Sequence, residues 1–266
     1  MTKPILYPHH VATIEKLTAH FQADPTVLAL IIGGSLAKGW GSESSDVDFM
    51  LVVTDEEYAR RLQTFDLLYF SRDFSDYEGG YVDGKIIDMA YLHDVLDHGS
   101  EPTRAAFLNA IVQFSRIDGL ERLIANIIEY PEADREEKMR SFYSQVLLGT
   151  WYVGEAVKRN NPYLLARTTA DLTLFGGRLI LAYNRLLYPY HKWLLRQLEN
   201  ATDKPEGFMD LTLAVLNQPG NESAQAYCEA IVQYRDWGVS FPEAVQYFTR
   251  DREWNWRGQK PPIHDW

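Results

Sequence analysis

Two short apolar segments joined by a glycine-rich turn constrain the fold of this chain more than any other feature. Residues 27–32 and 47–53 are rich in β-branched and aliphatic side chains, which predicts two strands. Gly33-Gly34-Ser35 follows the first strand, and Asp46-Val47-Asp48 begins the second. Because side chains alternate between the faces of a strand, Asp46 and Asp48 are expected on one face. The sequence therefore predicts paired carboxylates beside a tight turn.

The residue types in this segment favour binding of a metal and a phosphate. Two neighbouring carboxylates repel each other, and holding them beside a buried strand costs free energy unless a cation neutralises them. Mg²⁺ prefers oxygen ligands and keeps waters that phosphate oxygens can replace. Gly34 allows close approach of a phosphate, Ser35 offers hydroxyl and amide donors, and Lys38 adds a positive charge. The alternatives to this interpretation are that Asp46 and Asp48 lie at a solvated strand edge and that Lys38 is a solvated loop residue.

The spacing of these residues resembles the signature of the DNA polymerase β-like nucleotidyltransferases. The similarity is greatest to the small-molecule branch, which includes the aminoglycoside and lincosamide nucleotidyltransferases. The resemblance implies that Asp46 and Asp48 bind Mg²⁺ as catalytic residues. The family carries a third carboxylate on a later strand, and Asp88 is the position we match to it, as a metal ligand or a general base. The nucleotide-binding residues are expected to be Gly34, Ser35, Lys38, Ser45 and Lys192.

The activity implied by the resemblance is Mg²⁺-dependent transfer of a nucleoside monophosphate to a hydroxyl group of a small molecule. ATP is the expected nucleotide and AMP the transferred group, and the acceptor is a small molecule such as an antibiotic, as in antibiotic resistance. Two alternatives stay open. One is a protein- or tRNA-modifying nucleotidyltransferase of toxin–antitoxin type, and the other is a nucleotide-binding regulator without turnover.

Charge and cysteine content narrow the expected partners. The chain has 26 Lys and Arg against 37 Asp and Glu, a formal net charge of −11, which disfavours nucleic acid and suits a cationic acceptor. Its single cysteine, Cys228, excludes an intrachain disulfide and a cysteine zinc cluster. We find no secretory signal at the amino terminus and no apolar run near the ~20 residues of a membrane span. A cytoplasmic protein, monomeric or homodimeric, is expected.

The pattern along the chain predicts an α+β protein. Residues 1–130 are expected to form a mixed-sheet nucleotidyltransferase domain. Asp83-Gly84 is the preferred dipeptide of a type I′ turn, so residues 78–92 are interpreted as a hairpin and Asp83 as a turn residue. The other elements expected in this domain are helices at residues 8–23 and 55–64, a strand at residues 110–114 and a helix after residue 119.

Residues 131–266 are expected to form an all-α helical bundle that binds the substrate. A capping box of Asp134 and Glu137 is expected to open its first helix. Lys192 lies in an aromatic and basic cluster, residues 188–193, that either contacts the nucleotide or forms a core joint. His9-His10 is interpreted as a helix cap or a surface pair rather than a metal site. Further helices are expected at residues 164–187, 190–199, 206–216, 223–237 and 242–250.

Overall fold

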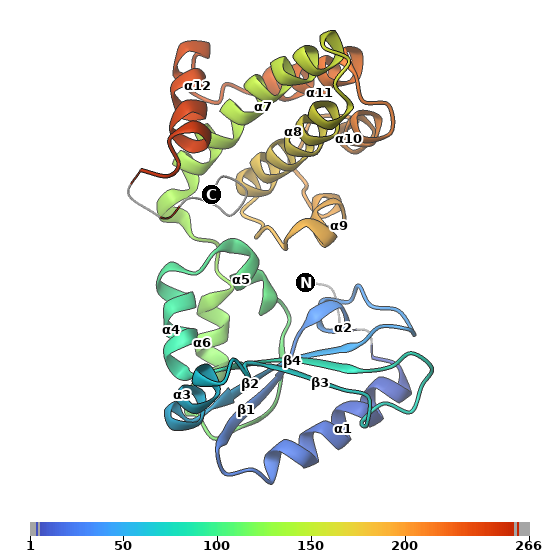
Figure 1. Cartoon of the computed structure of the whole chain (residues 1–266), viewed down its shortest axis with the longest axis vertical. Helices are drawn as coiled ribbons and strands as arrows, with labels where there is room; N and C mark the ends of the chain where they lie inside the picture. Colours follow the sequence, from blue (N-terminus) through green and yellow to red (C-terminus); the bar gives the residue numbers. More distant parts are fainter. Residues whose placement is uncertain (1–3, 5, 258–259, 261–266) are drawn as a thin grey trace. The chain divides into compact units, whose positions relative to one another are not determined.

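The structure is a computed structural model that describes residue 4, residues 6–257 and residue 260. We find no secretory signal in the amino-terminal segment. Residues 1–3 and 5 of that segment lie outside the described residues. The chain divides into two compact units, Met1–Glu129 and Tyr130–Trp266 (Figure 1). The first holds a mixed sheet and the described part of the second is helical, so the fold class is α+β as predicted. No helix among the described residues is long and apolar enough to span a membrane.

The first unit alternates helices and strands. Both strands that frame the glycine turn have the predicted bounds. The helices predicted in this unit are also confirmed, and their ends agree with the prediction to within two residues. The elements are α1 (Pro8–Gln22), β1 (Val27–Ile32), α2 (Gly34–Lys38), β2 (Val47–Val53), α3 (Asp55–Gln63), β3 (Leu68–Ser71), β4 (Val82–Ile87), α4 (Met89–His98), α5 (Glu101–Ala106), β5 (Ile111–Ser115) and α6 (Leu120–Ile127).

The five strands form one sheet in the order β3-β4-β2-β1-β5. β2 pairs antiparallel with β1 and parallel with β4, while β3 and β5 are the two edges. Side chains alternate across the sheet and separate two cores. Phe49 and Leu51 face α1 on one side, whereas Met50 and Val52 face α4 and α6 on the other (Figure 1). Asp48 lies on the second face and is half-buried.

The predicted hairpin at residues 78–92 is wrong. Asp83 and Gly84 lie inside β4, neither has a positive φ, and the strand continues to Ile87. A Cβ on Gly84 would lie 2.1 Å from the Phe49 ring, so the glycine makes room for an aromatic side chain on the neighbouring strand. The antiparallel partner of β4 is β3, which precedes it and which was not predicted.

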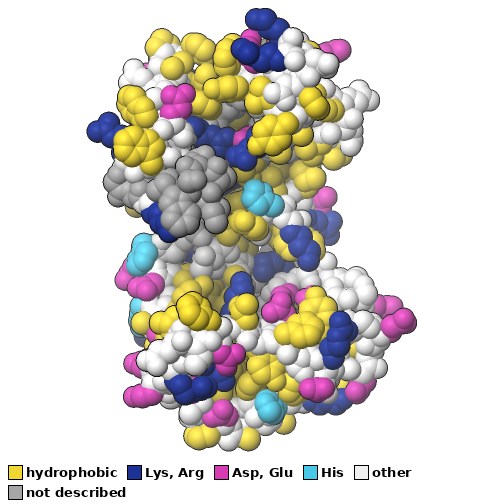
Figure 2. All heavy atoms as spheres, in the orientation of Figure 1, with side chains coloured by type: hydrophobic (Ala, Val, Ile, Leu, Met, Phe, Trp, Pro, Cys, Tyr) yellow, Lys and Arg dark blue, Asp and Glu magenta, His cyan; other side chains and the backbone are white. Residues whose placement is uncertain are grey.

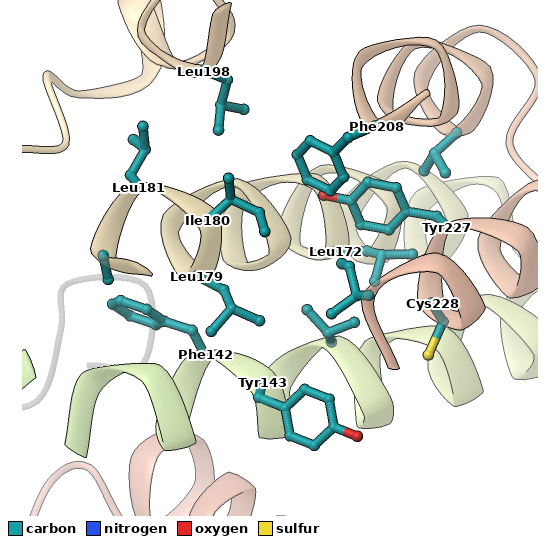
Figure 3. Close-up of a cluster of buried hydrophobic side chains, with 14 of the residues drawn as sticks. Phe142, Tyr143, Leu172, Leu179, Ile180, Leu181, Leu198, Phe208, Tyr227 and Cys228 are labelled. Carbon is teal, nitrogen blue, oxygen red and sulfur yellow. The ribbon is translucent and has the colours of Figure 1, made fainter. Parts of the chain in front are cut away.

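The described part of the second unit is helical. The long helices α7 and α8 lie side by side and contribute nine of the 20 buried residues of its main core cluster. Figure 3 shows Phe208 and Tyr227, whose ring centroids are 5.3 Å apart, packing over α8. Its helices are α7 (Arg135–Lys158), α8 (Pro162–Tyr183), α9 (Leu194–Glu199), α10 (Phe208–Asn217), α11 (Asn221–Tyr234) and α12 (Phe241–Phe248), with single turns η1 (Glu132–Asp134), η2 (His191–Trp193) and η3 (Thr249–Glu253).

The predicted capping box of α7 does not form. Asp134 is the N-cap residue, but its side chain makes no capping hydrogen bond, because the chain enters α7 directly from the turn η1. The Glu137 carboxylate instead accepts hydrogen bonds from Tyr247 and Arg250. Glu137 therefore ties α7 to α12 and η3.

Candidate functional site

The turn after β1 directly contacts the Asp48 side chain. The backbone N–H of Gly33 donates to the Asp48 carbonyl at 3.0 Å. Gly34 has a φ of +66°, and a Cβ at this position would lie 1.8 Å from Asp48 Oδ2. A side chain at residue 34 would thus occupy the place of the carboxylate, in a backbone conformation that favours glycine. The glycine turn and the carboxylate singled out in the sequence lie together.

Asp46 lies half-buried just before β2, two residues from Asp48. Asp46 is the main cause of the raised pKa of Tyr81, as an acceptor for its hydroxyl and as a negative charge, and burial and the charges of Asp48 and Asp83 raise that pKa further. All three carboxylates therefore lie within electrostatic range of one phenol. Tyr81 comes directly before β4. Its backbone carbonyl accepts a hydrogen bond from the N–H of Val47 at 3.1 Å, which ties the start of β4 to the start of β2.

Ser45, a predicted nucleotide contact, anchors the segment that leads into Asp46. Its carbonyl accepts hydrogen bonds from His10 Nε2 at 3.0 Å and from the Tyr77 hydroxyl at 2.7 Å. Its hydroxyl accepts from the backbone N–H of Ser42 at 2.9 Å. These bonds fix the approach of the chain to β2, and a contact of Ser45 with nucleotide stays a prediction.

His10 is a buried link between α1 and this segment. Its Nδ1 accepts from the backbone N–H of Tyr7 at 3.4 Å, so its Nε2 carries the hydrogen that is donated to Ser45. Burial lowers the pKa of His10, the charge of His9 lowers it further, and the bond to Ser45 opposes them. The interpretation of His9-His10 as a cap or a surface pair is incomplete, because His10 both caps α1 and is fully buried.

Lys38 is buried, with 6% of its surface exposed, so its interpretation as a solvated loop lysine is wrong. Its Nζ donates to the Gly34 carbonyl at 3.3 Å. Burial lowers the pKa of Lys38 to about 8, Asp48 opposes that shift, and Lys85 adds to it. A buried ammonium group close to a carboxylate offsets part of the repulsion between the acids. Ser35 is 8% exposed and lies in the same turn.

The structure separates Asp88 from the other acids and brings Asp83 to them. In the parallel pairing of β2 with β4, Asp48 stands opposite Asp83. Asp88 comes five residues later, which is roughly 16 Å along a parallel strand. Its carboxylate accepts from the backbone N–H of Tyr91 at 2.7 Å and caps α4. Asp83 is exposed and points to the same face as Asp48.

The residues fit a Mg²⁺ ion that shares its coordination with a substrate. Among the described residues, no group of three or more His, Cys, Asp and Glu side chains is arranged to hold a metal by itself. Mg²⁺ is commonly held by one or two carboxylates, with waters and substrate phosphates as its other ligands. Asp46 and Asp48 supply such oxygen ligands next to the Gly34 turn, where a phosphate can approach the backbone.

An aromatic and cationic group, formed by Phe70, Tyr81 and Arg72, lies beside Asp83. Phe70 on β3 pairs with Asp83 and is 61% exposed. The rings of Phe70 and Tyr81 are 5.2 Å apart, and the Arg72 guanidinium lies 5.8 Å from each. Neither this group nor β3 was predicted from the sequence. The alternation Leu68-Tyr69-Phe70-Ser71 before the charged Arg72 was the available signal.

Lys192 belongs to the second unit, whereas the other predicted site residues belong to the first. It is exposed in the turn η2, and its Nζ lies 5.3 Å from the centroid of the Trp193 ring. Tyr188 in the same cluster is buried. A contact between Lys192 and nucleotide stays a prediction.

The first unit thus has a mixed sheet in which carboxylates on neighbouring strands lie beside a glycine turn. No protein-family model and no curated protein matches the chain. Among solved structures, it is similar to a nucleotidyltransferase-like protein from Exiguobacterium sibiricum 255-15, with 12% identity and a TM-score of 0.48. The match covers 96% of this chain and 82% of that one.

Proposed function

We propose that this protein is a Mg²⁺-dependent nucleotidyltransferase that transfers a nucleoside monophosphate, AMP from ATP, to a hydroxyl group of a small molecule. The observation that carries the proposal is the contact between Gly34 and the Asp48 carboxylate, with Asp83 opposite Asp48 on β4. This contact places a turn suited to phosphate and a carboxylate suited to Mg²⁺ within one site.

In the proposed reaction, the acceptor hydroxyl oxygen attacks the α-phosphorus of the nucleotide, and the bond to pyrophosphate breaks. Mg²⁺, when bound, stabilises the charge on the attacking and leaving oxygens. Asp46 and Asp48 would hold the cation, and the Tyr81 hydroxyl would orient Asp46. Gly34 and Ser35 contact the phosphates, and Lys38 contributes positive charge behind them.

Asp83, rather than Asp88, is the residue to which we assign the third acidic role. Asp83 stands level with Asp48 and is exposed, so it is available to accept the proton of the acceptor hydroxyl or to complete the metal site. Asp88 is engaged as the cap of α4. The assignment of this role to Asp83 uses the strand register, whereas the assignment to Asp88 used the sequence alone.

The charged side chains around the candidate site and the net charge of the chain support a cationic acceptor. Three carboxylates, Asp46, Asp48 and Asp83, lie near two ammonium groups, Lys38 and Lys85. On the face drawn in Figure 2, Lys and Arg side chains lie in small separate groups among acidic and hydrophobic ones. Together with the net charge of −11, this favours a small cationic molecule such as an aminoglycoside over a polyanion.

Pyrophosphate release tests the proposal. The protein is incubated with each of the four nucleoside triphosphates and Mg²⁺, against aminoglycosides, lincosamides and a whole-cell metabolite extract. We expect release that needs an acceptor and is lost in the double variant Asp46→Asn/Asp48→Asn. Nucleotide binding without release under any condition would contradict transfer to these acceptors, and would favour a protein acceptor or a regulator without turnover.

A further inference from the structure

The edge strand β3 carries exposed apolar side chains. Leu68 is 70% exposed and Phe70 is 61% exposed, and both lie on one face of the sheet, where they pair with Lys85 and Asp83 of β4. Edge strands that avoid pairing with another chain usually contain a proline or a charged residue, and β3, Leu68-Tyr69-Phe70-Ser71, contains neither. The composition of β3 therefore favours the addition of a further strand.

The segment that leads into β3 is also apolar and exposed. The helix α3 has no buried residue, and Leu62 near its end is 51% exposed. Phe65 lies in the turn between α3 and β3 and is 94% exposed. Residues 62–70 thus expose four large apolar side chains, counting Leu68 and Phe70. Exposed apolar surface of this kind marks a site of protein–protein interaction.

The hydrogen bonding between β3 and β4 shows which backbone groups face the open edge. The N–H of Ile86 donates to the Leu67 carbonyl at 2.9 Å, so the backbone groups of Leu67 point towards β4. Successive residues of an antiparallel strand direct these groups to opposite sides. The N–H and C=O groups of Leu68 and Phe70 therefore point away from β4, where an added strand can bond to them.

We propose that β3 is the interface of a homodimer, in which the β3 strands of two copies pair antiparallel about a twofold axis at Tyr69. A strand that pairs antiparallel with its own copy obeys twofold symmetry, so each contact occurs twice. With Tyr69 at the axis, Leu68 of each copy stands opposite Phe70 of the other. The outward backbone groups of these residues then bond to one another, and their exposed side chains pack together on one face.

Charge complementarity favours this register over its neighbours. The register places Asp66 of each copy opposite Arg72 of the other, and both side chains are exposed. The Asp66 carboxylate already accepts from Arg61 at 2.9 Å, and a carboxylate can accept from a second guanidinium. With Phe70 at the axis instead, Arg72 would face Leu68. Two symmetric ion pairs therefore distinguish the register centred on Tyr69.

Sedimentation equilibrium of the full chain at increasing concentration tests the inference, which does not rest on the proposed transferase activity. We expect a species of twice the chain mass of 30.7 kDa. Leu68→Lys should weaken the dimer at least 10-fold, because it sets a charge against the apolar side chain of Phe70. Val11→Lys is the matched control, since Val11 is an exposed apolar residue of α1 and should not affect association.

An exchange of charges tests the register itself. Asp66→Lys and Arg72→Glu each set like charges opposite each other, so each variant alone should dimerise at least 3-fold more weakly than the wild type. An equimolar mixture of the two should regain the wild-type affinity, because both pairs of the mixed dimer join opposite charges. Circular dichroism confirms that each variant is folded.

Three results would overturn the proposal. The first is a wild-type protein that stays monomeric at every concentration. The second is a dimer that is unchanged by Leu68→Lys, since another surface would then hold it. The third is a mixture of Asp66→Lys and Arg72→Glu that associates no more tightly than either variant alone.

Discussion

Asp48 and Asp83 stand opposite each other on the parallel strands β2 and β4, although 35 positions separate them in the sequence. The pairing puts both carboxylates on the same face of the sheet, and the Gly34 turn lies against Asp48. Register, rather than local sequence pattern, therefore determines which acids meet at the candidate site.

Gly34→Ala should disrupt the site locally. A Cβ at residue 34 would lie 1.8 Å from Asp48 Oδ2, so the carboxylate must move. We expect nucleotide-transfer activity to fall at least 10-fold and the free energy of unfolding to fall by about 1–2 kcal/mol, the usual cost of a left-handed backbone for a residue with a side chain. Activity and urea unfolding are measured on the same preparation.

Gly79→Ala is the matched control for that experiment. Gly79 also has a positive φ, +74°, but no atom lies within 4 Å of the position of its Cβ. This variant should lose similar stability and keep its activity. If both variants lost activity equally, backbone strain alone would explain the loss, and the contact with Asp48 would not matter.

Tyr81→Phe should weaken the Mg²⁺ binding that activity requires. The Asp46 carboxylate is close enough to the Tyr81 hydroxyl to raise its pKa, and partners that orient a ligating carboxylate change metal affinity by about 10–100-fold. We expect the Mg²⁺ concentration for half-maximal activity to rise by at least 10-fold, with kcat at saturating Mg²⁺ less affected. Tyr91→Phe, on α4, serves as the control, and an unchanged Mg²⁺ curve for Tyr81→Phe would refute the positioning role.

His10 should make folding stability depend on pH. Its pKa in the folded protein is lowered from 6.5, so the unfolded chain binds more protons as the pH falls through 6.5, and stability is lost in that direction. The His10 contribution is fully present above pH 6.5. His10→Gln should reduce the difference in urea midpoint between pH 5.5 and pH 7.5, whereas His20→Gln, at an exposed position of α1, should not. Equal pH dependence in the wild type and His10→Gln would contradict this.

Local patterns in the sequence predicted much of the first unit. The strands 27–32 and 47–53 and the glycine turn are each defined by neighbouring residues, so their bounds and their proximity followed from periodicity and spacing. The helices of the second unit were predicted for the same reason. Several of their ends differ by a few residues, as at α9, which begins at Leu194 after the separate turn η2.

Long-range packing determined what the sequence did not predict. Asp83-Gly84 suggested a turn, but the glycine is required by the Phe49 ring on another strand. We matched Asp88, and not Asp83, to the third carboxylate because Asp83 was interpreted as a turn residue, and strand register is not visible in one sequence.

The most direct test of the site compares Asp83→Asn with Asp88→Asn in the pyrophosphate assay, with melting temperature as the check of folding. Asn is nearly as good an N-cap residue as Asp, so Asp88→Asn should keep both the cap of α4 and the activity. Asp83→Asn should keep the fold and lose at least 100-fold in rate. Full activity in Asp83→Asn, with activity lost in a folded Asp88→Asn, would contradict the assignment of the site to the paired ends of β2 and β4.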